Sequence, residues 1–470
     1  MKGEGREVRL LEVEEASATS PATQEDETAG QQTPVLKWYH WGLIISIGML
    51  GPFSQDSYVP NMPEMASELH TSSFYAGLTL QVNLLTKGIF NIWFGHLSDK
   101  IGRRPVIISS FFAYVAGAIC CSIAPTIGWL IAARVLQGIG ESTAALTQAI
   151  PRDVMDDEEE RMRMMAILGF IRPWAIMIAP SVGGLLGVAF GWRNVFMFLA
   201  GWGVLNLACA ALFLPETLQT TAATAPGGGG GAPAAAAGDR PSVKSQLRRL
   251  FCDRETCGLL ITVTLVRTNV PPMLSNISFV LEGEFGLSVI LCSLLIGSIP
   301  AVILLGNSYV FVNAKKLPRW KLLRIAIIVQ ACVGCAAFLV MPVASMTVWS
   351  DMLIFYAMVL DNSIIQVPLN TLYLQPLKDI AGFASGIQAF LCSIAPSVAG
   401  AAATAATNWV GAAGLMASLG TILVCCSLLF WAIFGLRAHA SEALCSNSSA
   451  EQGPGPVPAA PEQQQQQQQP

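Results

Sequence analysis

Apolar segments of about 20 residues, separated by short polar ones, recur along most of this chain. A helix of that length crosses the ~30 Å hydrocarbon layer of a bilayer. The pattern predicts twelve membrane-spanning helices, six on each side of a longer polar interval. They are expected at residues 38–60, 73–97, 105–125, 127–150, 164–189, 193–214, 257–281, 288–311, 322–343, 349–374, 380–406 and 411–436.

The polar intervals divide the chain into five parts. Residues 1–37 and residues 437–470, which end in a run of glutamines, are predicted to be disordered cytosolic tails, since neither has enough apolar residues to form a core. Residues 215–256 are expected to be a cytosolic linker that contains the flexible segment APGGGGGAPAAAAGD. Two six-helix halves remain, 38–214 and 257–436.

A short sequence motif occurs, nearly unchanged, once in each half. IAPSVGG occupies residues 178–184, and IAPSVAG occupies residues 394–400, 216 residues later. Both copies fall in the fifth span of their half, and the same offset brings the seventh span onto the first. The sequence therefore predicts an all-α membrane fold of two pseudo-symmetric halves, an architecture in which a substrate site lies between the halves.

The composition agrees with a polytopic membrane protein. Hydrophobic residues make up 53% of the chain and charged residues 12%, whereas soluble domains have roughly 25% charge. The loops after even-numbered spans contain seventeen Lys and Arg residues, and those after odd-numbered spans contain Arg193 alone. Because basic loops stay in the cytosol, both termini are predicted to be cytosolic. The plasma membrane and the vacuolar membrane both remain open as locations.

The sequence excludes several classes of function. It contains no phosphate-binding loop of the form G-x-x-x-x-G-K-[ST], no cluster of metal-ligating residues and no nucleophile–base set. We therefore expect a protein that is not an enzyme, is not driven by ATP and needs no metal or cofactor. Its expected partners are a small-molecule substrate, protons and the lipid bilayer, with no nucleic acid, and the protein is expected to be a monomer.

The loop between the second and third spans, GHLSDKIGRRP, has a constrained pattern. Gly95 is expected to permit close helix approach. Asp99 is expected to bond the turn, pair with Arg103 or face the positive end of a neighbouring helix. With Gly102 and Arg104, the loop resembles the signature loop of the major facilitator superfamily, G-x-L-[SA]-D-[RK]-x-G-R-[RK]. The C-terminal half has FVNAKK at the equivalent place, without the glycine and the aspartate.

A segment of the fourth span also resembles this superfamily. It reads RVLQGIG and is similar to the motif R-x-x-Q-G-x-G. The matching residues are Arg134, Gln137, Gly138 and Gly140.

The fifth span carries a pattern similar to the antiporter motif G-P-x-x-G-G. Pro180, Gly183 and Gly184 match, whereas Ala175 and Ala179 replace two glycines of the motif. In the first span, DSYVPNMP, which begins at Asp56, resembles the D-x-Y-x-P-x-x-P segment of drug–proton antiporters of the Bcr/CflA type. LPETL at 214–218 resembles the end of their sixth span. The resemblance implies a twelve-helix transporter that exports drugs or other small organic compounds in exchange for protons.

Charged residues within the predicted spans need a partner or a water-lined cavity, because each costs a few kcal/mol in the bilayer centre. These residues are Asp56, Lys87, Arg134, Glu141, Arg172, Arg267 and Asp361. Five of them fall in spans one, four, seven and ten, the spans that the resemblance assigns to the walls of the central cavity.

Asp56 is the expected proton-coupling carboxylate. It and Arg134 both lie in the outer part of the membrane, so that Arg134 would pair with it and tune its protonation. The alternative is a fixed structural ion pair between the two residues. Glu141 is the competing proton site, and we expect Arg172 to pair with it. Lys87 is expected to pair with a neighbouring helix.

Four residues are candidates for the substrate cavity. Arg267 and Asp361 lie near the membrane midplane, where they form either a buried pair that shapes the C-terminal half or a contact to substrate. Phe53 and Tyr58, in the first span, are candidates for contact with a lipophilic substrate. Together these patterns favour a proton-coupled exporter working by alternating access. The alternatives are a uniporter or proton symporter that imports a nutrient, and a receptor or scaffold that does not transport.

Overall fold

The structure, a computed structural model, describes residues 37–148, 150–155, 157–217, 243–313, 318–340 and 347–434. The two tails, residues 1–36 and 435–470, lie outside these residues. Residues 218–242, the part of the linker that contains its Gly- and Ala-rich segment, also lie outside them. The predicted disorder of the two tails and the predicted flexibility of this segment thus concern residues outside the described ones.

The N-terminal half contains six long helical stretches, as the apolar pattern predicts. Its elements are α1 (Trp38–Asp56), η1 (Val59–Asn61), α2 (Met62–Glu68), α3 (Ser73–Ile101), α4 (Arg103–Ser122), α5 (Ile127–Glu141), η2 (Ser142–Gln148), α6 (Ile150–Val154), α7 (Glu158–Phe190) and α8 (Trp192–Phe213). The fourth span is interrupted, because the α-helix ends at Glu141 and continues as the tighter helix η2.

The C-terminal half repeats this arrangement. Its elements are α9 (Val243–Cys252), α10 (Arg254–Arg267), α11 (Val270–Ser278), η3 (Phe279–Glu284), α12 (Val289–Asn313), α13 (Arg319–Val340), α14 (Val348–Leu374), η4 (Gln375–Ile380), α15 (Ala381–Val410) and α16 (Ala412–Phe434). The seventh span breaks after Arg267, just before Pro271 and Pro272, since proline removes a helical hydrogen bond. The expected linker includes one helix, α9, whose Leu250 is buried.

Nine helical segments of the described residues are long and apolar enough to cross a membrane. The predicted spans that fall outside this set are α1, α3 and the interrupted α5. These are helices with intramembrane polar groups, among them Asp56, Lys87 and Glu141. The apolar criterion is therefore weakest where polar side chains gather in the interior.

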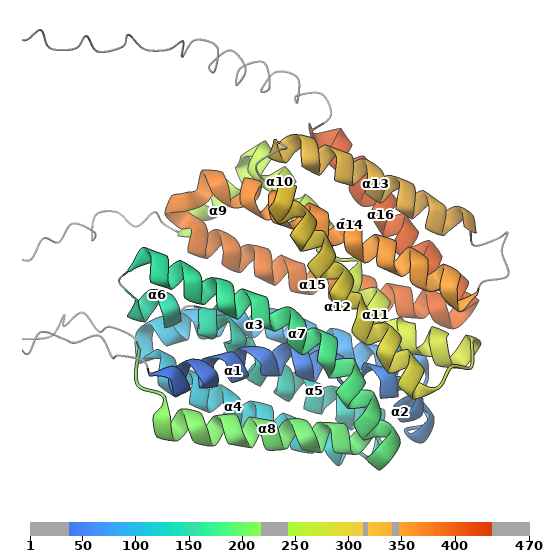
Figure 1. Cartoon of the computed structure of the whole chain (residues 1–470), viewed down its shortest axis with the longest axis horizontal. Helices are drawn as coiled ribbons and strands as arrows, with labels where there is room; N and C mark the ends of the chain where they lie inside the picture. The colour runs from blue at the N-terminus through green and yellow to red at the C-terminus, as the bar shows by residue number, and fades with distance from the viewer. Residues whose placement is uncertain are drawn as a thin grey trace, which may run out of the picture.

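The two halves lie side by side, with the blue-to-green half below the yellow-to-red half in Figure 1. Two long helix pairs join them, α3 with α15 and α7 with α12. The repeated motifs IAPSVGG and IAPSVAG lie in α7 and α15, so each copy is on a helix of the seam between the halves. The two pairs are equivalent, since each joins the fifth span of one half to the second span of the other.

Candidate functional site

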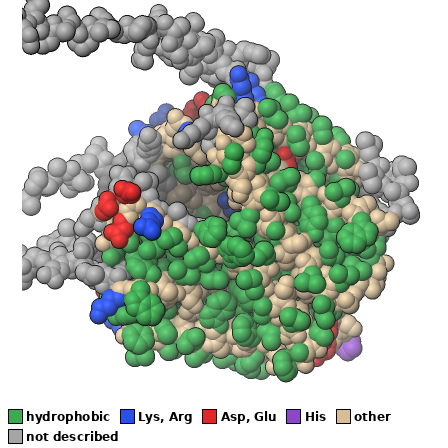
Figure 2. Space-filling view, viewed as in Figure 1, with side chains coloured by type: hydrophobic (Ala, Val, Ile, Leu, Met, Phe, Trp, Pro, Cys, Tyr) green, Lys and Arg blue, Asp and Glu red, His purple; other side chains and the backbone are tan. Residues whose placement is uncertain are grey.

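A cavity of about 500 Å³ lies between the two halves. Figure 2 shows it as a hollow, with Lys or Arg atoms visible inside. Helices α1, α3, η2 and α7 line it from the N-terminal half, and α10, α14 and α15 line it from the C-terminal half. Its polar and charged lining residues are Gln55, Lys87, Asn91, Thr147, Arg267, Asn370, Ser385, Gln388 and Ser393.

Hydrogen bonds between the halves close the seam near α2 and η3, the end of the bundle opposite α6 and α9. Ser278 Oγ donates to the Val59 carbonyl (2.7 Å), and Gln81 Nε2 donates to Ser275 Oγ (3.1 Å). Ser397 Oγ donates to the Gln81 carbonyl at 3.1 Å. These bonds hold this end shut, while the cavity lies toward the opposite end of the bundle, where α6 and α9 are labelled in Figure 1.

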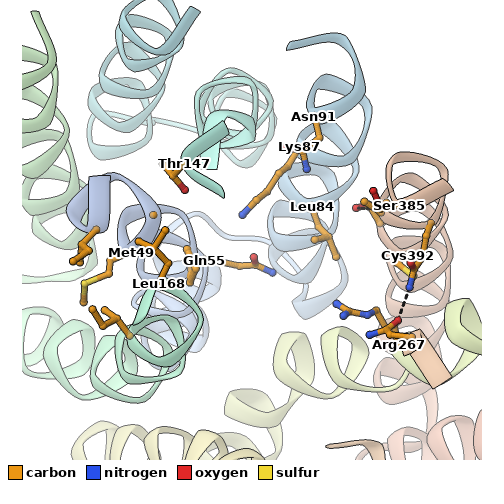
Figure 3. Close-up of a pocket in the computed structure, with 18 of the residues that line it drawn as sticks. Met49, Gln55, Leu84, Lys87, Asn91, Thr147, Leu168, Arg267, Ser385 and Cys392 are labelled. Carbon is orange, nitrogen blue, oxygen red and sulfur yellow. Dashed lines mark hydrogen bonds between the residues drawn. The ribbon is translucent and has the colours of Figure 1, made fainter. Parts of the chain in front are cut away.

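Lys87 on α3 pairs with Glu141 at the end of α5, with 3.6 Å between Nζ and Oε2. The Lys87 side chain is 13% exposed on the cavity side and that of Glu141 only 1%. Because a buried carboxylate without a partner is costly, the lysine offsets the burial of Glu141. In Figure 3, Lys87 extends from its helix into the cavity.

A chain of hydrogen bonds leads from Arg134 to Glu141. Arg134 Nη1 donates to Gln137 Oε1 (2.7 Å), and Gln137 Nε2 donates to Ser54 Oγ (2.9 Å). Ser54 Oγ in turn donates to Glu141 Oε1 at 2.8 Å. Every bond in the chain points toward the carboxylate. The span-four motif thus places its arginine and glutamine in one buried network with the carboxylate of Glu141.

Arg134 is fully buried, and the groups that contact its guanidinium are mainly neutral. Its guanidinium carbon lies 4.3 Å from the centre of the Tyr58 ring and 5.7 Å from that of Phe196, a cation–π arrangement. The Tyr58 hydroxyl shares a hydrogen bond with Thr79 Oγ1 at 3.2 Å. The expected ion pair with Asp56 is absent among the described residues, so that prediction is corrected.

Asp56 ends α1 and is buried, at 6% exposure. The preceding residue, Gln55, lines the cavity, but Asp56 itself is not among the lining residues. The side chain of Arg172, the expected partner of Glu141, lies outside the described part of the structure. The described cationic partner of Glu141 is Lys87.

Of the four residues predicted for the cavity, Arg267 lines it. Phe53 instead packs edge-on against Trp202, with ring centres 5.1 Å apart, and Tyr58 lies beneath Arg134. Asp361 is buried among α14 and its neighbours, outside the cavity lining and without an ion pair to Arg267 in the described residues. The cavity predictions for Phe53, Tyr58 and Asp361, and the Arg267–Asp361 pair, are therefore wrong for this arrangement.

The signature loop is fixed by a residue that the sequence analysis did not assign to it. Glu216, from the segment after α8, accepts from the backbone N–H groups of Arg103 (2.8 Å) and Arg104 (3.2 Å) at the start of α4. Gly102 has φ of 103°, a conformation that favours glycine, and any Cβ there would meet the Glu216 carboxylate. Gly95 has open space around it, so its predicted role in close helix approach is corrected. The Asp99 side chain lies outside the described part.

Glycines of the other two motifs do permit close packing. A Cβ at Gly140 would overlap Tyr114 of α4, and one at Gly138 would lie 2.9 Å from the Asn83 carbonyl oxygen. In α7, a Cβ at Gly183 would overlap the Ser57 carbonyl, and one at Gly184 would overlap Ser293 of the other half.

Pro180 lies inside α7, three residues before Gly183. Asn61 Nδ2 donates to the Gly183 carbonyl at 2.9 Å, which ties the segment after α1 to this helix. The span-five motif therefore lies where α7 meets both the end of α1 and α12 of the other half.

The described helices and the cavity between them are those of a multi-pass membrane protein built from two six-helix halves. The sequence profile of the Major Facilitator Superfamily matches residues 44–400. The chain belongs to this superfamily of small-molecule transporters. Among solved structures, it is similar in fold to a bacterial homologue of the human lysosomal transporter Spinster. The TM-score is 0.65 at 15% identity, over 84% of this chain and 96% of that one.

Three relatives show the range of similarity. An uncharacterised transporter of this superfamily from Bacillus subtilis, YdgK, is 30% identical over 64% of this chain and 72% of its own length. Citrate exporter 1 of Aspergillus niger is 33% identical over 38% of this chain and 34% of its own. A chloramphenicol resistance protein of Pseudomonas aeruginosa is 32% identical over 38% of this chain and 44% of its own. The last two matches span less than half of each relative.

Proposed function

We propose that the protein is a secondary active transporter that exports small organic compounds, coupled to protons, by alternating access. The observation that carries this proposal is the Lys87–Glu141 ion pair, because it joins a buried carboxylate to a cation in the wall of the cavity. The names of the relatives, an exporter of citrate and a resistance protein for chloramphenicol, support export.

Protonation of Glu141 removes the partner charge of Lys87 and so changes the charge of the cavity wall. A cationic substrate would take the place of the proton at Glu141, which gives exchange of substrate for protons. An anionic substrate would instead bind Lys87, and a proton would then neutralise Glu141. Anion and proton would therefore move in the same direction. The charge of the substrate therefore decides the direction of coupling.

Alternating access requires the closed end of the seam to open. In that movement the bonds of Gln81 to Ser275 and Ser397 break, and the cavity closes at the other end. Gly184 of α7 allows the close contact with Ser293 of α12 along which the halves rock. We assign the open end to the cytosol, together with both termini, because the basic loops lie at that end.

Asp56 is a second candidate for the proton carrier. Its burial at the end of α1, one residue from the cavity-lining Gln55, supports this role. The signature loop, held by Glu216, supports the rigid movement of the N-terminal half.

The proposal is tested with the full-length chain in liposomes that contain a pH-sensitive dye. Organic anions, cations and neutral compounds of similar size are added in turn, and the lumenal pH is followed. Substrate-dependent proton movement that is absent from protein-free liposomes is expected. If no compound of any charge moves protons, the proposed function is wrong.

A further inference from the structure

The charged side chains that line the cavity have one sign. Among its described lining residues, the charged ones are Lys87 and Arg267, and none is a carboxylate. Lys87 comes from the N-terminal half and Arg267 from the C-terminal half. In Figure 3 they lie on different walls of the cavity. A ligand between the halves would therefore meet a cation on each side.

Arg267 is available to a ligand. It is exposed toward the cavity and has no ion-pair partner among the described residues. It is also the last residue of α10, where the negative end of the helix dipole and the final carbonyl groups favour a cation. The break in the seventh span thus holds a guanidinium at the cavity wall. A guanidinium binds carboxylates through two parallel hydrogen bonds.

The remaining lining suits an organic anion rather than an inorganic one. Amide groups of Gln55, Asn370 and Gln388 supply hydrogen-bond donors, and Gln388 already donates to Asn370 Oδ1 at 2.6 Å. Met49 and Leu168 form an apolar part of the wall in Figure 3. A cavity of about 500 Å³ is of the size that holds a small organic molecule.

We infer that the substrate is a small organic anion, with carboxylate groups held between Lys87 and Arg267 and its apolar part against Met49 and Leu168. This inference rests on the proposed transport function. It disfavours a cationic compound as the substrate, because an unpaired cation in the cavity wall repels a cationic ligand.

The inference also sets the direction of coupling. An anion bound to Lys87 draws that cation away from Glu141, and a proton then neutralises the buried carboxylate. The other titratable or charged groups around Glu141 are Arg134 of the same helix and Tyr114 and Cys121 of α4. Among these groups, Lys87 alone lines the cavity. Anion and proton are therefore expected to bind together and to move in the same direction.

The experiment uses three aromatic probes that differ in charge: phthalate, its neutral diamide and the benzyltrimethylammonium cation. Binding to the purified full-length chain is measured by the shift of the thermal unfolding midpoint, and uptake is measured in proteoliposomes. We expect phthalate to stabilise the protein and to be taken up together with protons, and the other two probes to do neither.

Variants identify the site. Arg267→Gln is expected to raise the apparent Kd for phthalate at least about tenfold, since it removes a charge-assisted bond. Arg267→Lys keeps the charge and should retain more of the binding. The matched control is Arg254→Gln, which removes one positive charge from the other end of the same helix, outside the cavity. Arg254→Gln should bind phthalate like the wild type.

The outcomes separate the two proposals. Uptake of benzyltrimethylammonium in exchange for protons, without phthalate binding, would overturn the anion inference and leave the transport function standing. Unchanged phthalate binding in Arg267→Gln would also overturn it, as would failure of all three probes to bind. The transport function itself is contradicted only by the absence of proton movement with every compound of the wider panel.

Discussion

Lys87 and Glu141 form an ion pair between α3 and α5, with the carboxylate buried and the ammonium group at the cavity wall. The pair connects the interior network of the N-terminal half to the space between the halves. This connection is the basis of the proposed coupling, and its energetics can be measured directly.

Lys87→Met leaves the Glu141 carboxylate buried without this cation. We expect a loss of about 3–5 kcal/mol in the free energy of unfolding, as for other buried pairs that lose one partner. The double variant Lys87→Met with Glu141→Gln should recover most of this loss, because it removes the uncompensated charge. Unfolding midpoints in detergent measure both effects. Equal stability of the single and double variants would contradict the pairing.

The exposed pair of Arg193 and Glu68 is the matched control for this measurement. Both side chains are partly exposed, at 35% and 49%. Arg193→Gln should therefore lower the stability by only ~0–1 kcal/mol.

The stacking of Arg134 on Tyr58 predicts different effects for two substitutions of the tyrosine. Tyr58→Phe keeps the ring and removes the bond to Thr79, so we expect a change of about 1 kcal/mol. Tyr58→Leu removes the aromatic face as well, and should cost about 0.5–2 kcal/mol more. Thermal unfolding of the two variants tests this order, and equal destabilisation would argue against the cation–π contact.

Gly183 is predicted to be intolerant of any side chain. Because a Cβ would overlap the Ser57 carbonyl, Gly183→Ala should destabilise the protein by about 1–3 kcal/mol and slow transport. Gly95→Ala is the control within another motif, since nothing lies within 4 Å of that position. A Gly183→Ala variant as stable and active as Gly95→Ala would contradict the close contact.

Glu216 is predicted to stabilise the start of α4. Glu216→Ala removes the acceptor for two backbone N–H groups and should lower the stability by about 0.5–2 kcal/mol, the range found for lost helix caps. Glu159→Ala, an exposed residue near the start of α7, is the control. Hydrogen exchange at Arg103 and Arg104 should rise in Glu216→Ala and not in Glu159→Ala. Unchanged exchange would rule out the cap.

The sequence predicts the membrane class and the two-half arrangement because apolar length and duplication are properties of the chain alone. The repeated motifs in α7 and α15 correctly mark equivalent helices, and both helices lie at the seam between the halves. The helix breaks at Glu141 and Arg267 were missed. The prolines at 271 and 272 were an available signal for the second break, and nothing as plain marks the first.

The candidate site was harder to predict, because a sequence indicates how deep a residue lies in its span but not which way its side chain faces. Asp56 and Arg134 are at similar predicted depth, yet Arg134 turns toward Tyr58 and Gln137. Lys87 was expected to pair with a neighbouring helix, and that pair is confirmed, but its partner could not be named. The cap by Glu216 joins residues more than a hundred positions apart, so no local pattern reveals it.

The coupling role of Glu141 is tested most directly by lumenal pH in proteoliposomes that contain the wild type, Glu141→Gln or Asp56→Asn. Addition of the transported compound, with phthalate as the first probe, starts the measurement. We predict that the wild type moves protons with the substrate and that Glu141→Gln moves substrate without them. Asp56→Asn is the comparison that assigns the proton to one carboxylate or the other. Full proton coupling in Glu141→Gln would contradict the account.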